Sequence, residues 1–568
     1  MRFLSFIFSF IFLSTFLWSQ ELSIHTISTH IQQNIATKVK AKNRAMVKTI
    51  YAQMGNQPIW IGNHNSRKVT QLINALNNPL FNYKNKSFDQ ASISRLFFML
   101  DNGEVSKSKQ SAVYARLDLI LTSSMVRLVR FMVQGDVDWA LVQRKLKAMK
   151  GSDDIKANWE MSIKPFPAST QLVSAIENEV ITAYFTSLIP MKKRYKNLIK
   201  ILQDYRVMNT FPKIRYANKA LGFGNNSSRV KAVKQRLQIT GDYPRGIEIN
   251  SQFDERTRQA VISYQKRYLL KVTGIVDNNT MYYLNQPASK NIQAIITNLD
   301  KTKLYPKKFE SEHIEINIPD FNLRYYKHDR LNMKKGIVVG RIDRPTPLFT
   351  DYIEYMVINP TWTIPDNLIK RDLIHVLRDN QNYLDENNIH VFSGDNEISI
   401  KQSILDKYEH SSKRVPYRFV QYPGNTNALG RVKFIFPNKY AVYLHDTDNK
   451  SLFGRRYKVY SSGCMRVEEP FELVDKLLVH AKGSYSHSKI DAILDTMKPT
   501  TIRLNKNIPV HIVYFTVYEE KGKAYFKNDI YLYDQIIQES VVGNKKSTFS
   551  VPKKRMVSVN KGTKPLSN

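Results

Sequence analysis

A single cysteine among 568 residues excludes any internal disulfide, so apolar cores must hold this chain together. That cysteine, Cys464, stands in the run Ser461-Ser462-Gly463-Cys464-Met465-Arg466. Its thiol is therefore either buried as a small apolar group or used in chemistry. The chain is too long for one core, and two to four domains of about 100–200 residues each are expected.

The first residues predict export. Arg2 precedes an uncharged apolar stretch that runs to Trp18, and Ser19-Gln20-Glu21 follows. This is the layout of a signal peptide over residues 1–20. An uncleaved anchor helix is the alternative, although the stretch is shorter than the roughly 20 apolar residues that a spanning helix needs.

The formal net charge of +36 predicts affinity for polyanions. Export argues against nucleic acid, which leaves the carboxylates of cell-wall stem peptides and the phosphates of lipids. A solvated basic surface without a partner is the alternative. The basic tail over residues 538–568 is expected to be disordered, and contact with anionic wall or lipid is its alternative role. Membrane contact is expected only through this tail or an uncleaved signal.

Hydrophobic periodicity divides the rest of the chain. Residues 21–220 follow the three- and four-residue spacing of helices, which predicts a helical scaffold domain. Residues 221–288 form a unit of three short helices, and residues 289–311 form a returning helix with a linker. The period becomes two over residues 312–537, where a lid insertion of helix and polar loop interrupts a β-rich domain at 366–429. The expected fold class is multidomain α+β.

A histidine near the lone cysteine is a candidate base. His445 ends a strand predicted over residues 440–445, and alternation places Tyr443 and His445 on one face of it. A hairpin-like return across residues 448–457 would then bring Cys464 beside His445. A thiol with a neighbouring base is a candidate nucleophile.

The residues around the thiol suit acyl chemistry. Gly463 allows a close backbone approach, and the N–H groups of Gly463 and Cys464 are candidates to bind an oxyanion. Arg466 can hold a carboxylate through two parallel hydrogen bonds. Spacing alone leaves open a buried structural cysteine and a structural histidine. No metal-ligand pattern is visible in the sequence.

These motifs resemble a known family. His445-Asp446-Thr447 followed by Ser461 to Val467 is similar to the signature of YkuD-type L,D-transpeptidases, H-[GD]-T … S-x-G-C-[IVM]-R. Three further runs resemble the large YcbB-like members of that family: Val339-Gly340 with Arg344-Pro345-Thr346-Pro347, Asn359-Pro360 with Trp362 and Pro365, and Asn427-Ala428-Leu429-Gly430-Arg431-Val432-Lys433-Phe434.

The three-helix unit at 221–288 resembles the small peptidoglycan-binding domain of wall enzymes. The matching residues are Leu237-Gln238, Phe253-Asp254, Thr257, Ala260-Val261, Tyr264-Gln265, Gly274, Val276-Asp277, Thr280 and Leu284-Asn285. This resemblance implies binding to the wall, and a unit that serves only in packing is the alternative.

The resemblance to L,D-transpeptidases implies a two-step acyl transfer on peptidoglycan. Cys464 would attack the L-centre carbonyl of the diamino acid in a donor tetrapeptide stem, D-alanine would leave, and a thioester would form. The side-chain amine of an acceptor stem's diamino acid would then give a 3→3 cross-link. His445 would move the proton. The other implied site residues are Asp446, whose carbonyl orients His445; Ser462 and Gly463, which shape the oxyanion pocket; Arg466; and the substrate-binding residues Tyr443, Trp362, Thr447 and Ser461.

The same resemblance implies the periplasm of a Gram-negative-type envelope, no cofactor and no metal. It also implies wall enzymes that supply tetrapeptides, and acylation of Cys464 by carbapenems. Two other functions stay open. One is an L,D-carboxypeptidase, in which water resolves the thioester, and the other is a wall-binding scaffold with an inactive thiol.

Overall fold

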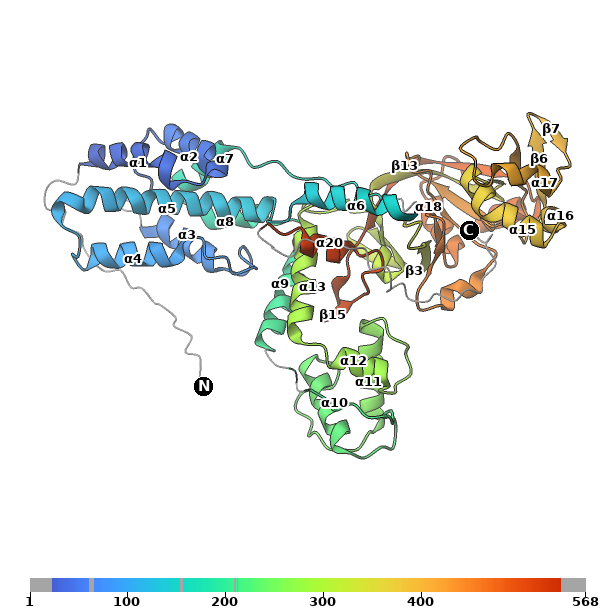
Figure 1. Cartoon of the computed structure of the whole chain (residues 1–568), viewed down its shortest axis with the longest axis horizontal. Helices are drawn as coiled ribbons and strands as arrows, with labels where there is room; N and C mark the ends of the chain where they lie inside the picture. The colour runs from blue at the N-terminus through green and yellow to red at the C-terminus, as the bar shows by residue number, and fades with distance from the viewer. Residues whose placement is uncertain (1–22, 61–65, 154–156, 209–210, 212, 543–568) are drawn as a thin grey trace. The chain divides into compact units, whose positions relative to one another are not determined.

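The computed structural model describes residues 23–60, 66–153, 157–208, 211 and 213–542 (Figure 1). The expected signal peptide and most of the expected basic tail lie outside these residues. Contacts divide the described residues into two compact units: those up to 133 with 165–189, and those of 134–164 with those from 190 to 542. No helix in the described ranges is long and apolar enough to cross a membrane.

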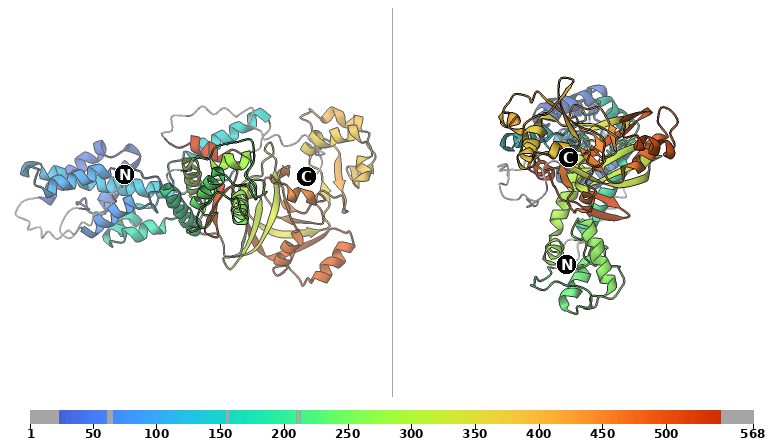
Figure 2. Two further views of the ribbon diagram at one scale, coloured as in Figure 1. Left: turned by 90° about the horizontal axis from the view of Figure 1, so that it is seen from below. Right: turned by 90° about the vertical axis from the view of Figure 1, so that its right-hand side faces the viewer.

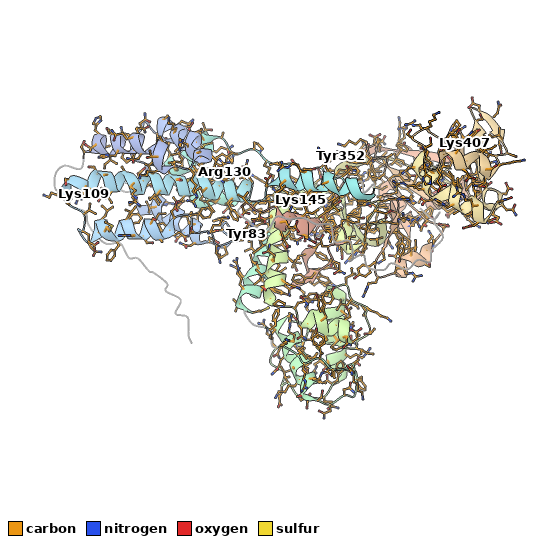
Figure 3. All side chains as sticks on the ribbon, in the orientation of Figure 1. Tyr83, Lys109, Arg130, Lys145, Tyr352 and Lys407 are labelled. Carbon is orange, nitrogen blue, oxygen red and sulfur yellow. The ribbon has the colours of Figure 1, made fainter. Side chains whose placement is uncertain are left out.

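The first unit is a helical bundle around the long helix α5 (Lys107–Val133), which is buried along most of its second half. Tyr83 packs on Phe131 of α5 with ring centroids 4.9 Å apart (Tyr83 is labelled in Figure 3). The other helices of the unit are α1 (Ile24–Lys38), α2 (Ala41–Gln53), α3 (Ser66–Asn77), α4 (Gln90–Asp101), α7 (Ser169–Glu177) and α8 (Ile181–Ser187).

A buried carboxylate organises the centre of this bundle. The Asp118 side chain, on α5, accepts hydrogen bonds from the backbone N–H groups of Ile59 and Trp60 at 2.8–3.1 Å, and from the Tyr51 hydroxyl at 2.6 Å. Burial raises the pKa of Asp118 to about 6, and these donors oppose the rise. Asp118 thus fixes the loop before α3 onto the bundle.

In the second unit, helix α9 (Lys192–Val207) and the returning helix α13 (Ala288–Thr302) run side by side (Figures 1 and 2). Helix α6 (Trp139–Asp153) contacts α20 (Tyr533–Glu539), where Lys145 Nζ lies 3.0 Å from a Glu539 carboxylate oxygen (Lys145 is labelled in Figure 3). Lys301 of α13 forms a buried ion pair with Asp534 of α20 at 2.5 Å. Helices from distant parts of the sequence therefore contact one another.

The three-helix unit forms as the sequence predicts, with α10 (Ser228–Ile239), α11 (Glu255–Arg267) and α12 (Asn278–Leu284). The Asp254 side chain accepts a hydrogen bond from the Thr257 N–H at 2.8 Å and so caps the N-terminus of α11. Asp277 caps α12 through the Thr280 N–H in the same way.

A nine-stranded sheet forms the β-rich domain, in the order β11-β3-β12-β10-β9-β4-β13-β1-β2. A further pairing of β2 with β3 closes the sheet on itself. Its strands are β1 (His313–Asn317), β2 (Asn322–Lys327), β3 (Arg330–Gly340), β4 (Thr350–Ile358), β9 (Val432–Ile435), β10 (Leu444–His445), β11 (Val459–Ser461), β12 (Met465–Val467) and β13 (Thr500–Val513).

Helices α18 (Pro470–Leu478) and α19 (His487–Asp495) pack on the core of this sheet, and β14 (Val517–Glu520) pairs with β15 (Lys523–Phe526) in a separate hairpin. Leu473, Val474 and Leu477 of α18 are fully buried, so one face of this helix packs on the sheet core.

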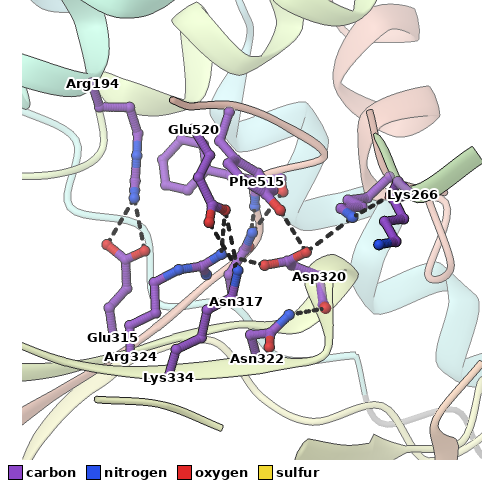
Figure 4. Close-up of polar contacts among 12 residues, drawn as sticks. Arg194, Lys266, Glu315, Asn317, Asp320, Asn322, Arg324, Lys334, Phe515 and Glu520 are labelled. Atoms are coloured by element: carbon purple, nitrogen blue, oxygen red, sulfur yellow. Dashed lines mark hydrogen bonds and ion pairs between the residues drawn. The ribbon is translucent and has the colours of Figure 1, made fainter. Parts of the chain in front are cut away.

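Ion pairs tie the first strands of the sheet to neighbouring elements (Figure 4). Arg194 of α9 holds both carboxylate oxygens of Glu315 in β1, at 2.7 and 2.8 Å. Arg324 of β2 lies 2.5 Å from Asp320 and 3.8 Å from Glu520 of the hairpin. Because these buried charges are paired, they fix the register of the elements that carry them.

The insertion in the sheet domain contains more than the helix and polar loop that the sequence indicated. It has its own core and a four-stranded sheet in the order β5-β8-β6-β7, and it forms a lobe beside the main sheet (yellow to orange in Figure 2). Its elements are β5 (Trp362–Thr363), α14 (Asp366–Leu368), the π-helix η2 (Ile369–Leu373), α15 (Ile374–Asp379), α16 (Tyr383–Glu386), β6 (Ile389–Ser393), β7 (Asn396–Ile398), α17 (Gln402–Leu405), the 3-10 helix η3 (Asp406–Tyr408) and β8 (Arg418–Gln421).

The helix and the folded insertion are confirmed, and the strands were missed because strands of two to five residues are too short to show a period of two. The sequence did contain one signal of these strands. Gly394-Asp395 joins β6 to β7, with Gly394 at φ 60°, and such a pair between short apolar runs is typical of a hairpin.

Candidate functional site

The strand expected over residues 440–445 is shorter than predicted, because only Leu444 and His445 pair as β10. Ala441 has a φ of 52°, and the Asn438 side-chain oxygen accepts hydrogen bonds from the N–H groups of Tyr440 and Val442. A turn therefore replaces the first part of the strand. The expected division of faces survives, since Val442 and Leu444 enter the sheet core.

The return to the cysteine is a parallel crossover, and the hairpin-like return was wrong. β10 pairs with β12 in parallel, with Leu444 opposite Met465 and His445 opposite Arg466. Between them the chain forms the 3-10 helix η4 (Lys450–Gly454) and β11, which pairs in parallel with β3. Cys464, directly before β12, therefore lies beside the residue that precedes Leu444.

His445 is fully buried and its tautomer follows from its contacts. Nδ1 lies 2.5 Å from the carbonyl oxygen of Asp446, and because a carbonyl only accepts, Nδ1 carries the proton. Nε2 is then unprotonated, and it has no hydrogen-bond partner among the described residues. Burial, and then the charge of Arg466, lowers the pKa of His445 to about 3. The ring is a neutral base with a free lone pair.

Cys464 is half-buried and reduced. Burial raises the pKa of its thiol to about 11, against the opposing effects of a backbone hydrogen bond from Tyr443 and the charges of Arg466 and Lys433. The resting pair is consequently a neutral thiol and a neutral imidazole. A proton must leave the sulfur before it attacks.

The turn that presents Cys464 is held by its own side chains. The Ser461 hydroxyl accepts a hydrogen bond from the Gly463 N–H at 3.2 Å and donates one to the Cys464 carbonyl at 2.5 Å. Gly463 adopts a φ of 122°, which side chains rarely tolerate. One of the two expected oxyanion donors, the Gly463 N–H, is therefore already engaged by Ser461.

A loop from the start of the domain supports this turn from outside. Arg344 donates to the Ser462 hydroxyl at 2.9 Å and pairs with Asp372 of η2 at 2.7 Å. The Thr346 hydroxyl donates to the Gly463 carbonyl at 2.9 Å. The turn is thus linked through one guanidinium to the insertion. The Arg-Pro-Thr-Pro run marked the family resemblance, but nothing in its spacing revealed these contacts.

Asp446 has a structural side chain. Its carboxylate accepts a hydrogen bond from the Arg431 N–H at 2.9 Å and forms an ion pair with Lys450. Gly430 has a φ of 60°, and a Cβ there would lie 2.4 Å from the Asp446 carboxylate carbon. Only glycine leaves room for this carboxylate, which explains the Leu-Gly-Arg run as a packing requirement.

Arg466 lies opposite His445 across the pairing of β10 with β12, and Thr447 follows His445 by two residues. Arg466 is fully buried, and its Nη1 donates to the Thr447 hydroxyl at 3.3 Å. Its Nε and Nη2 have no hydrogen-bond partner among the described residues. Burial lowers the pKa of Arg466 to about 10. Thr447 is itself buried.

The two aromatic residues expected to bind substrate belong to the same neighbourhood. The Tyr443 ring lies 5.7 Å from that of His445, centroid to centroid, and packs against the core of the insertion. Trp362 is buried within that core. The described residues contain no group of three or more His, Cys, Asp or Glu side chains arranged to hold a metal ion.

One sheet face thus presents a thiol, a neutral histidine and a buried arginine, and Tyr443 on the same face packs against the insertion. The sequence model of the "L,D-transpeptidase catalytic domain" matches residues 311–507. Those of the "Scaffold domain" and the "Putative peptidoglycan binding domain" match residues 45–202 and 226–284. The chain therefore carries an L,D-transpeptidase catalytic domain together with a scaffold domain and a peptidoglycan-binding domain, in the multidomain α+β fold that the sequence predicts.

A curated relative is the "Putative L,D-transpeptidase" of Haemophilus influenzae, 32% identical over 257 residues. The match covers 45% of this chain and 51% of the relative, so the chain spans about half that protein's length. Two solved L,D-transpeptidases, from Xylanimonas cellulosilytica and Stackebrandtia nassauensis, are 14% and 10% identical. They cover 53% and 54% of this chain, and 100% and 97% of their own, with TM-scores of 0.17 and 0.19, too low to carry an argument.

Proposed function

We propose that this protein is an exported L,D-transpeptidase that forms 3→3 cross-links between peptidoglycan stems, with Cys464 as the nucleophile. The observation that carries the proposal is the unpartnered Nε2 of His445, on a strand that pairs with the one following the thiol. A buried lone pair without a donor costs free energy, and a hydrogen bond from a thiol brought to Nε2 would remove that cost.

In the first step, His445 Nε2 takes the proton of Cys464, and the sulfur attacks the L-centre carbonyl of the donor diamino acid. The C–N bond to D-alanine breaks, and the proton on Nε2 passes to the leaving amine. A thioester then links Cys464 to the stem. The Asp446 carbonyl supports the imidazolium through Nδ1 at 2.5 Å.

In the second step, the side-chain amine of an acceptor stem attacks the thioester. The C–S bond breaks, His445 takes a proton from the amine, and the thiolate recovers one to restore Cys464. Because the insertion packs against Tyr443 beside His445, we propose that it shields the thioester from water and favours the amine. If water reaches the thioester as easily as the acceptor amine does, the same site acts as an L,D-carboxypeptidase.

The proposed setting follows from the substrate. Residues 1–20 would direct export to the periplasm of a Gram-negative-type envelope, where tetrapeptide stems are made by other wall enzymes. The unit containing α10–α12 would bind the peptidoglycan of the cell wall. Carbapenems, which present a strained carbonyl to the same nucleophile, would acylate Cys464.

Mass spectrometry of muropeptides tests this function most directly. Cells that express the wild-type protein should accumulate 3→3 dimers, and Cys464→Ala and His445→Ala should abolish them while the proteins stay folded by circular dichroism. Trimmed tripeptides without dimers would show a carboxypeptidase. An unchanged muropeptide composition would mean that the protein is a wall-binding scaffold with an inactive thiol. A meropenem adduct on any residue other than Cys464 would exclude the proposed nucleophile.

A further inference from the structure

Lys433 lies on the same face of the sheet as the proposed catalytic pair. β9 pairs antiparallel with β10, with Lys433 directly opposite His445, and opposite residues share a face. Lys433 Nζ lies 5.9 Å from the centroid of the Tyr443 ring and donates to the Thr361 carbonyl at 3.3 Å. Its charge is also one of those that lower the pKa of Cys464. The sequence motifs contained this lysine but gave it no role.

The charge of Lys433 is not neutralised within the site. It is half-buried, and none of the carboxylates in the described structure forms an ion pair with it. The nearby Asp446 is occupied by Lys450, and Asp448 interacts with Arg466. Burial lowers the pKa of Lys433, as expected for a cation that lacks an anionic partner.

Lys433 and Arg466 therefore place two positive charges on one sheet face, but only one can meet a substrate. Arg466 is fully buried beside His445, whereas Lys433 keeps part of its surface exposed. A half-buried ammonium with a single, long hydrogen bond to a carbonyl has donors left for an anion. An anion that arrives with the substrate would restore the balance of charge.

We propose that Lys433 binds the terminal carboxylate of the donor stem, the carboxylate of the D-alanine that leaves. The proposal rests on the proposed transpeptidase function. This carboxylate is two bonds from the nitrogen of the scissile amide, so a donor carbonyl at Cys464 brings it to the same sheet face. Lys433 would thereby orient the scissile bond and select stems that end in a free acid.

Donor stems that end in D-alanine or in D-alanine amide provide the test. The wild-type protein should use the acid at least about tenfold better in kcat/KM, as a charge-assisted hydrogen bond predicts. Lys433→Met should remove this preference, and Lys433→Arg should keep most of it. The control is Lys439→Met, which removes an exposed lysine paired with Glu160 and should leave the preference unchanged. A preference that persists in Lys433→Met would overturn the proposal.

A second measurement separates this proposal from the proposed function. Cys464 is alkylated with anionic iodoacetate and with neutral iodoacetamide, and the ratio of the two rates is recorded. Lys433→Met should lower the ratio about tenfold and change the iodoacetamide rate much less. If both rates fall together, Lys433 acts on the thiol and the proposal fails; if neither changes, it also fails. The ratio is informative even for a protein that cross-links no stems.

Discussion

Two buried polar clusters in this chain are built in opposite ways. In the helical unit, both oxygens of Asp118 accept hydrogen bonds from Tyr51 and the loop before α3. On the sheet, Nε2 of His445 and two nitrogens of Arg466 are equally buried but have no partner among the described residues. An unsatisfied buried group costs about 1–3 kcal/mol. The first cluster contributes to stability, and the second retains a cost that a reacting proton or a substrate can remove.

The protonation state of the sheet cluster gives the largest expected effect. Because the pKa of Cys464 is raised to about 11 and that of His445 is lowered to about 3, neither group titrates between pH 6 and 10. The thiolate fraction, and with it the rate of alkylation by iodoacetamide, should rise about tenfold per pH unit, or about 10⁴-fold over this range. A rate that levels off below pH 8 would mean a resting thiolate–imidazolium pair.

Removing the base should separate catalysis from stability. His445→Ala should lower the rate at which a carbapenem acylates Cys464 by about 10³-fold at pH 7, the range of general-base catalysis. Stopped-flow absorbance measures this rate. A moderate loss of stability on thermal denaturation is expected, since the deleted ring is fully buried but makes only one hydrogen bond, to the Asp446 carbonyl. A large loss of stability with little loss of rate would place His445 among the structural groups.

The sequence predicted features that depend on neighbouring residues, and it did not predict those that depend on strand pairing. The three-helix unit depends on residues close in sequence, and the structure confirms it; Asp254 caps its second helix. Motif order predicted Cys464 and His445 on neighbouring elements, but the parallel pairing of β10 with β12 could not be predicted from it. Strands of two or three residues carry too little periodicity to show their direction.

The missed residues act across long separations. Arg344 reaches Ser462, 118 positions away, and Asp372 of the insertion. Lys433 faces His445 through the register of two short strands. Neither contact follows from local spacing, because register is set by tertiary packing. The motifs identified these residues as part of the family pattern without their function.

Removing Asp118 should have the opposite effect to the one expected for His445→Ala: stability should fall while the acylation rate stays the same. Asp118→Ala leaves the N–H groups of Ile59 and Trp60 and the Tyr51 hydroxyl without their shared acceptor, and should destabilise α5 locally by about 3 kcal/mol. Hydrogen exchange of α5 amides measures this, and carbapenem acylation should be unchanged. Asp101→Ala, at an exposed position on α4, is the control and should alter neither. Unchanged exchange in Asp118→Ala would refute the stabilising role.

The smallest expected effect concerns a group that joins the insertion to the thiol turn. Asp372→Asn removes the charge that holds Arg344, so the hydrogen bond from Arg344 to Ser462 loses its orientation. Acylation of Cys464 should slow about tenfold, mainly in the maximal rate, because a displaced turn misaligns the sulfur without removing a substrate contact. Asp385→Asn, exposed on α16 of the same insertion, is the matched control and should act like wild type. If Asp372→Asn changes only the half-saturating carbapenem concentration, the insertion governs entry of the ligand. The positions of Cys464, His445 and Arg466 would then not depend on the insertion.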